Sequence, residues 1–280
     1  MGCRRLPYTI NEGARISWEE HGSGPPIVLI MGLSFSHEMW YRVLPCLTSS
    51  YRVILHDNRG VGRSDTPSGP YRIKQMARDA VAVMSAAGAD KAHVMGASMG
   101  GMIAQELALL HPERVASLLL GCTSHGGILA RWPKFVRPRG SIRQSESNRR
   151  TRERALIPLL YADSTPLERI HEDLDVHRRC AVTNRGVINQ LAGILLWSSY
   201  RRLPRIGVPT LVVHGDQDRL VPPANGKVVA SRIPGAKFQL LPKAGHILMT
   251  DQPDACERLM LDFLQQVSRG KANDNGNGHH

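Results

Sequence analysis

Short, continuous apolar runs alternate along the chain with stretches in which apolar residues recur at helical spacing. Runs of this kind are typical of strands covered on both faces. The alternation therefore predicts an α/β fold with a mainly parallel, doubly wound sheet. The predicted strands cover residues 8–20 (a strand or hairpin), 26–32, 51–57, 93–95, 114–122, 209–215 and 237–241, and the predicted helices cover 39–47, 73–87, 102–110, 222–232 and 253–267.

The alternation stops after residue 122 and resumes only at Pro209. Between these two points, the spacing of the apolar residues predicts helices over 152–162, 166–182 and 187–197. We expect a helical cap over 123–205, inserted after the sixth strand at the carboxyl edge of the sheet, where it could act as a lid. Residues 1–122 and 206–269 then form the core domain. The Gly- and Asn-rich tail, 270–280, is expected to be disordered.

The segment Gly96-Ala97-Ser98-Met99-Gly100-Gly101 joins a predicted strand to a predicted helix and fits the pattern G-x-S-x-G. A strand that reverses into a helix this quickly forces its central residue into a strained conformation with positive φ. Glycines on either side remove the Cβ atoms that would clash. The hydroxyl of Ser98 is then exposed at the positive end of the helix, so we predict that Ser98 is a nucleophile.

A serine nucleophile needs a base, and the base needs an orienting acid, each on a loop after a strand. Two acids, Asp216 and Asp218, follow the strand at 209–215, and His246 follows the last predicted strand. We favour Asp218 because it lies further into its loop, whereas an acid next to the strand end more often caps backbone N–H groups. His93, His111 and His214 lie in or beside core elements and are interpreted as packed or hydrogen-bonded neutral side chains.

An oxyanion hole would complete this chemistry. The backbone N–H of Met99, directly after the nucleophile, is one expected donor. The second is expected from the loop after the strand at 26–32, and we choose the N–H of Leu33, which Ser34 could assist.

Composition adds limits on partners and compartment. The 280 residues are 42% hydrophobic and 21% charged, with a formal charge of +12. Residues 131–154 hold nine basic and two acidic residues, a net +7. No interleaved aromatic residues or nucleic-acid motif accompany this segment, so we interpret it as a solvated surface rather than a nucleic-acid or membrane site.

The five cysteines have no spacing that indicates a zinc site or a disulfide framework. With no signal peptide and no apolar run long enough to span a membrane, we expect a cytoplasmic protein.

The chain resembles the α/β-hydrolase superfamily, in particular its capped esterases, lactonases, cofactor-free perhydrolases and carbon–carbon bond hydrolases. The resemblance spans residues 27–267 and depends on DNRGVGRSD (57–65), GASMGG (96–101), HGDQDRLVP (214–222) and AGH (244–246). It implies a Ser98–His246–Asp218 triad that needs no cofactor or metal. The carbon–carbon hydrolases usually carry Trp after the catalytic His, where this chain has Ile247.

These observations predict a serine carboxylesterase acting on small to medium hydrophobic acyl esters through an acyl-enzyme. One alternative uses the same triad for carbon–carbon hydrolysis, lactone opening, perhydrolysis or acyl transfer. Another is a ligand-binding homologue that has lost catalysis. The oligomeric state is left open.

Overall fold

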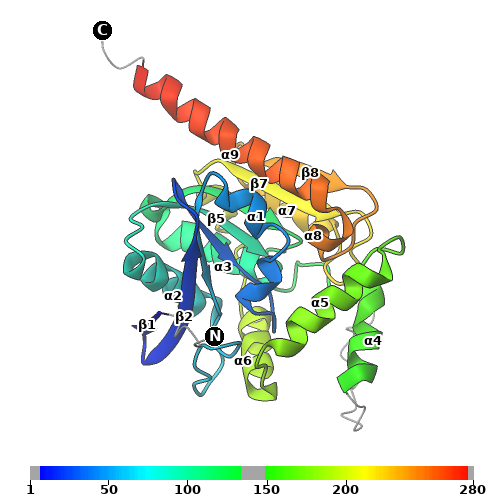
Figure 1. Ribbon diagram of the computed structural model, residues 1–280. Helices are drawn as coiled ribbons and strands as arrows, with labels where there is room; N and C mark the ends of the chain where they lie inside the picture. Colours follow the sequence, from blue (N-terminus) through cyan, green and yellow to red (C-terminus); the bar gives the residue numbers. More distant parts are fainter. Residues whose placement is uncertain (1–6, 134–148, 277–280) are drawn as a thin grey trace.

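The computed structural model describes residues 7–133 and 149–276 and contains an eight-stranded sheet with helices on both faces (Figure 1). The strands are β1 (Tyr8–Asn11), β2 (Ala14–His21), β3 (Pro26–Ile30), β4 (Arg52–His56), β5 (Ala92–Ala97), β6 (Val115–Gly121), β7 (Thr210–Gly215) and β8 (Lys237–Leu241). The α-helices are α1 (Leu44–Thr48), α2 (Ile73–Ala86), α3 (Met99–Leu110), α4 (Arg149–Leu160), α5 (Leu167–Arg179), α6 (Asn184–Leu195), α7 (Ala224–Arg232), α8 (Leu248–Asp251) and α9 (Pro253–Gly276).

The strand order is β1-β2-β4-β3-β5-β6-β7-β8. The first two strands form the predicted hairpin, and β2 pairs antiparallel with β4, whereas the pairs from β4 to β8 are all parallel. The predicted mainly parallel α/β sheet is therefore confirmed. In such a sheet the loops that leave the carboxyl ends of neighbouring strands gather at one edge, and this edge carries the candidate site.

Two hydrophobic clusters lie on opposite faces of the sheet because successive side chains of a strand point in opposite directions. In β3, Val28 and Ile30 belong to a cluster that includes side chains of α2, α3 and α7. Ile27 and Leu29 belong to the other cluster, with α1, α5 and α9. Burial on both faces explains why β3 has no polar position.

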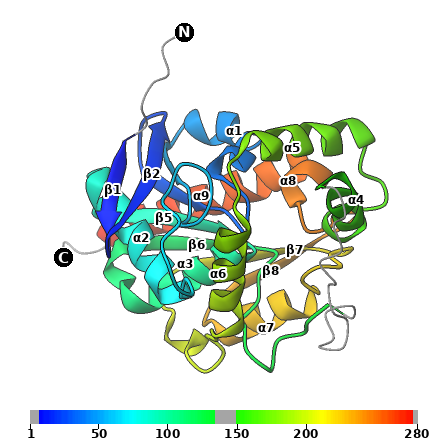
Figure 2. The ribbon, with the colours of Figure 1, turned by 90° about the horizontal axis from the view of Figure 1, so that it is seen from below.

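Helices α4, α5 and α6 follow β6 as the predicted cap, and they lie below the strands in Figure 1, on the side that faces the viewer in Figure 2. The buried carboxylate of Asp173 fastens α5 to the body. It accepts hydrogen bonds from the hydroxyls of Tyr41 (2.6 Å) and Thr250 (2.6 Å), and within the cap from that of Tyr161 (3.0 Å). None of the helices in the described part of the chain is long and apolar enough to cross a membrane.

Two local predictions differ from the structure. The single helix expected over 39–47 is divided into a 3₁₀ helix, His37–Trp40, and α1, because Pro45 fits only the first turn of a helix. The tail expected to be disordered from Gly270 is helical as far as Gly276, since an existing helix extends at little cost per residue. Most of the Arg-rich segment 131–154 lies outside the described residues.

Candidate active site

Ser98 lies between the end of β5 and the first residue of α3, with φ 56° and ψ −120°. The positive φ is the strained conformation that the sequence predicts for a nucleophile elbow. The flanking glycines are required by close backbone contacts: a Cβ on Gly96 would collide with the carbonyl of Gly100, and one on Gly100 would collide with that of Ile30. The turn therefore brings α3 against both β5 and β3.

His246 and Asp218 meet at the same edge, from the loops after β8 and β7. His246 Nδ1 lies 2.8 Å from Asp218 Oδ2. The other oxygen, Oδ1, accepts the backbone N–H groups of Leu220 (3.0 Å) and Val221 (2.8 Å). Burial alone would raise the pKa of the Asp218 carboxyl, but the neighbouring His246 and the hydrogen bonds hold it well below its usual range. The group is thus a stable carboxylate.

Asp216, the alternative acid, lies elsewhere in the loop. Its Oδ1 accepts the N–H of Ala244 at 3.3 Å, so this side chain joins the loops after β7 and β8 through backbone contact. Of the two acids, Asp218 is the one hydrogen-bonded to His246.

His214 is a second imidazole at the same carboxylate. Its Nε2 lies 2.8 Å from the carbonyl oxygen of Val221 and 3.2 Å from Asp218 Oδ2. Because both neighbours only accept, Nε2 carries a proton and donates it. The sequence predicts a packed or hydrogen-bonded histidine here, but not that its partner is the site carboxylate. The spacing His-x-x-x-Asp at the end of a strand was the available signal.

Cys122 lies just past the end of β6 and is also buried against the site, with φ 45°. Its Sγ, a carboxylate oxygen of Asp218 and a ring nitrogen of His246 all lie within 4.8 Å of one another. Within the described ranges, these three residues are the group that could together offer ligand atoms to a metal ion. The hydrogen bond between His246 and Asp218 already joins two of them.

The loop after β3 lies directly beside Ser98. A Cβ on Gly32 would be 3.1 Å from Ser98 Cβ and 3.6 Å from its hydroxyl oxygen. Leu33, the next residue, is half-buried. The N–H of Ser34 donates to Gln190 Oε1 (3.0 Å), so that amide is already used. Met99, directly after Ser98, is the first residue of α3, where a helix has N–H groups without an intrahelical acceptor.

The cap touches both sides of this site. The carbonyl of Leu160, the last residue of α4, accepts the N–H groups of His246 (2.7 Å) and Ile247 (3.0 Å). Arg219, next to Asp218, forms an ion pair with Asp163 at 2.6 Å. The described cap residues are therefore bonded to the loops that carry the candidate acid and base.

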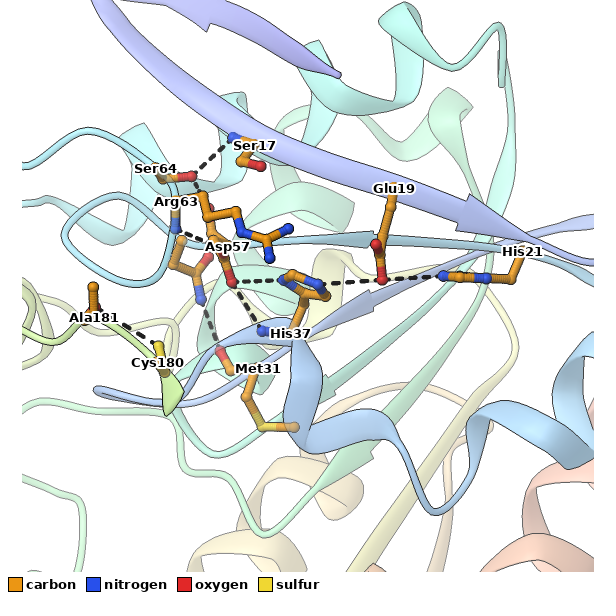
Figure 3. A network of polar contacts seen from close by, with 11 residues as sticks. Ser17, Glu19, His21, Met31, His37, Asp57, Arg63, Ser64, Cys180 and Ala181 are labelled. Atoms are coloured by element: carbon orange, nitrogen blue, oxygen red, sulfur yellow. Dashed lines mark hydrogen bonds and ion pairs between the residues drawn. The ribbon is translucent and has the colours of Figure 1, made fainter. Parts of the chain in front are cut away.

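A further polar network, drawn in Figure 3, is centred on the buried side chain of His37, the first residue of the 3₁₀ helix that follows the loop after β3. The ring of His37 lies between Asp57 (Nδ1 to Oδ1, 2.7 Å) and Glu19 (Nε2 to Oε1, 3.2 Å). Burial alone would lower the pKa of His37, but the two carboxylates outweigh it and raise the pKa to about 9. The hydrogen bond to His37 lowers the pKa of Glu19 to about 2. No local pattern in the sequence predicts this charged histidine.

Comparison with known proteins gives a consistent result. A family model described as alpha/beta hydrolase fold matches residues 25–159 and 178–253. RutD of Azorhizobium caulinodans, a proposed carbamate hydrolase, is 32% identical, over 94% of this chain and all of RutD.

Two solved structures also resemble the chain closely. The enol-lactonase from Burkholderia xenovorans LB400 superposes with a TM-score of 0.82 at 28% identity, covering 92% of this chain and all of that one. A thermophilic esterase from Thermogutta terrifontis superposes with a TM-score of 0.78 at 26% identity, covering 94% and 97%.

Proposed function

Because the chain belongs to the alpha/beta hydrolase fold family, we propose that it is a serine hydrolase that cleaves carboxylic esters of small to medium hydrophobic acyl groups. The observation that carries the proposal is that loops after parallel strands of one sheet carry Ser98 at a strained elbow and His246 hydrogen-bonded to the buried carboxylate of Asp218. The esterase among the structural relatives supports the ester as substrate class.

The proposed mechanism follows from the hydrogen bonds of the histidine. Nδ1 of His246 donates to Asp218, so Nε2 is the ring nitrogen left to act as base. Nε2 takes the proton of the Ser98 hydroxyl as its oxygen attacks the ester carbonyl, and then returns it to the departing alcohol. Water, activated by the same nitrogen, releases the acid from the acyl-enzyme. Asp218 stays ionised and stabilises the imidazolium.

The N–H groups of Leu33 and Met99 are the proposed donors to the oxyanion. Gly32 lies against Ser98, which supports a donor from the next peptide, and Met99 begins α3, whose positive end favours developing negative charge. The N–H of Ser34 is excluded from this role by its bond to Gln190. Each such donor contributes about 10²–10³-fold in rate.

Hydrolysis of p-nitrophenyl esters of increasing acyl length tests the proposal. Ser98→Ala should lower kcat by about 10⁶-fold. Ser117→Ala is the matched control, because Ser117 is buried in β6 and bonds His93 rather than the site. Unchanged turnover in Ser98→Ala would refute the proposal. If the wild-type protein binds esters without cleaving them, and Ser98 does not react with a fluorophosphonate, the alternative of a ligand-binding homologue is favoured.

Lactone opening is the second candidate, supported by the likeness to the enol-lactonase along that enzyme's whole length. The triad would act identically, with the ring oxygen as a leaving group that stays tethered to the acyl-enzyme. Measuring kcat/KM for a lactone and for its open-chain ester on the same protein separates the two. A higher kcat/KM for the lactone would identify lactones, rather than open-chain esters, as the substrate class.

A further inference from the structure

Gln190, in the cap helix α6, is completely buried and makes two hydrogen bonds to different parts of the body. Its Oε1 accepts the N–H of Ser34, in the loop beside the nucleophile, at 3.0 Å. Its Nε2 donates to the carbonyl of Arg59 at 2.9 Å. One side chain of the cap thus joins the loops after β3 and β4.

Ser34, whose N–H is bound by Gln190, has an unfavourable backbone conformation. Ser34 has φ 64°, in the left-handed region that non-glycine residues seldom occupy. Such a conformation persists only where the surroundings hold it. The hydrogen bond from Ser34 to Gln190 is a direct restraint of this kind, and it acts next to Leu33 and two residues from Gly32, which lies beside Ser98.

Gln190 is itself held rigidly. Arg59, whose carbonyl it binds, is buried and forms a two-bond ion pair with Asp79, at 2.6 Å for each bond. Helix α6 lies so close to the loop after β4 that a Cβ on Gly186 would collide with the carbonyl of Gly60. A continuous set of buried contacts therefore connects Asp79 to the peptide after Leu33.

We propose that Gln190 is a positioning residue: it holds the loop after β3, which carries the proposed oxyanion donor Leu33, in its active conformation, so that the cap is a structural part of the catalytic site. This inference rests on the proposed function, because it assumes that the loop supplies an oxyanion donor. The two hydrogen bonds of Gln190 described above go to the backbone of Ser34 and Arg59 and not to Ser98. The loss of Gln190 should therefore reduce stabilisation of the transition state more than binding of the substrate.

The test compares Gln190→Met with Gln105→Met. Methionine keeps the length of the side chain and removes both hydrogen bonds. Gln105 is the matched control because it is also fully buried and also makes two hydrogen bonds, with the carbonyl of Ser124 and the hydroxyl of Ser199. Gln190→Met should lower kcat about 10- to 100-fold, a smaller loss than the removal of a whole oxyanion donor causes. KM should change by less than about twofold. Gln105→Met should lower Tm by about as much as Gln190→Met does, but it should leave kcat unchanged.

Ser34→Gly in the Gln190→Met background provides a rescue. Glycine adopts positive φ without a restraint, so this double variant should recover part of the lost kcat, and it also remains informative if the single variant does not fold. Equal loss of kcat in the Gln190 and Gln105 variants, an effect on KM alone, or no recovery in the double variant would overturn the proposal.

The rate at which a fluorophosphonate labels Ser98 separates this proposal from the proposed function. If the wild type reacts with the probe but hydrolyses no ester or lactone, the proposed function fails, and slower labelling of Gln190→Met than of Gln105→Met still supports the positioning role. Equal labelling rates overturn that role alone. A wild-type protein that neither hydrolyses nor reacts overturns both.

Discussion

Replacing His37 by glutamine should remove a pH-dependent part of the stability of this protein. The ring of His37 is bonded to two carboxylates, and only 4% of the side chain is exposed, so water screens these pairs little. The pKa of His37 is about 9 in the folded protein, against an ordinary value of 6.5. Each unit of this difference corresponds to about 1.4 kcal/mol, so the charged network contributes about 3 kcal/mol.

The sign follows from proton linkage. A group whose pKa is raised by folding stabilises the native state fully below its unfolded pKa, and the contribution is lost as the pH rises through the folded pKa. For His37 this window runs from about pH 6.5 to about pH 9. The lowered pKa of Glu19, about 2, acts in the opposite direction and in another window: its contribution is lost as the pH falls from about 4.5 toward 2.

Urea denaturation of the wild type and of His37→Gln at about pH 6 and about pH 10 measures the effect. The difference in the free energy of unfolding between the two proteins should be about 3 kcal/mol larger at the lower pH. His93→Gln is the control, because His93 is buried but bonds the uncharged hydroxyl of Ser117 at 2.7 Å. A difference between wild type and His37→Gln that stays constant across this range would refute the reasoning.

Two further predictions concern the site and the elbow. His214→Phe removes a hydrogen-bond donor from Asp218 Oδ2, so the carboxylate attracts the imidazolium of His246 more strongly. The acid limb of the plot of kcat/KM against pH should therefore move to higher pH. An unmoved limb together with a lower Tm would mean that His214 only packs against the site. Gly100→Ala should lower the free energy of unfolding by at least about 2 kcal/mol, because its Cβ would meet the carbonyl of Ile30. Gly207→Ala, with no atom within 4 Å of the added Cβ, should change it by less than about 0.5 kcal/mol in the same urea titration.

Much of the architecture was predictable from the sequence because it depends on local patterns. Continuous apolar runs mark strands buried on both faces, and β7, predicted over 209–215, covers Thr210–Gly215 with every residue buried. The elbow was predictable because glycine is needed wherever backbone atoms approach this closely, as Gly96 and Gly100 do. The order serine, acid, histidine also follows from the chain, since each lies just after a strand.

Other features depended on the tertiary structure, because they join residues far apart in the chain whose separation no local pattern encodes. The charged state of His37 requires the approach of Glu19, in β2, and of Asp57, just after the end of β4. The contact between Gln190 and Ser34 spans 156 positions and exists only because α6 packs against the loops at the sheet edge. The sequence by itself determined which residues could do chemistry at that edge, and only the packing of the cap and strands decided which partners hold them.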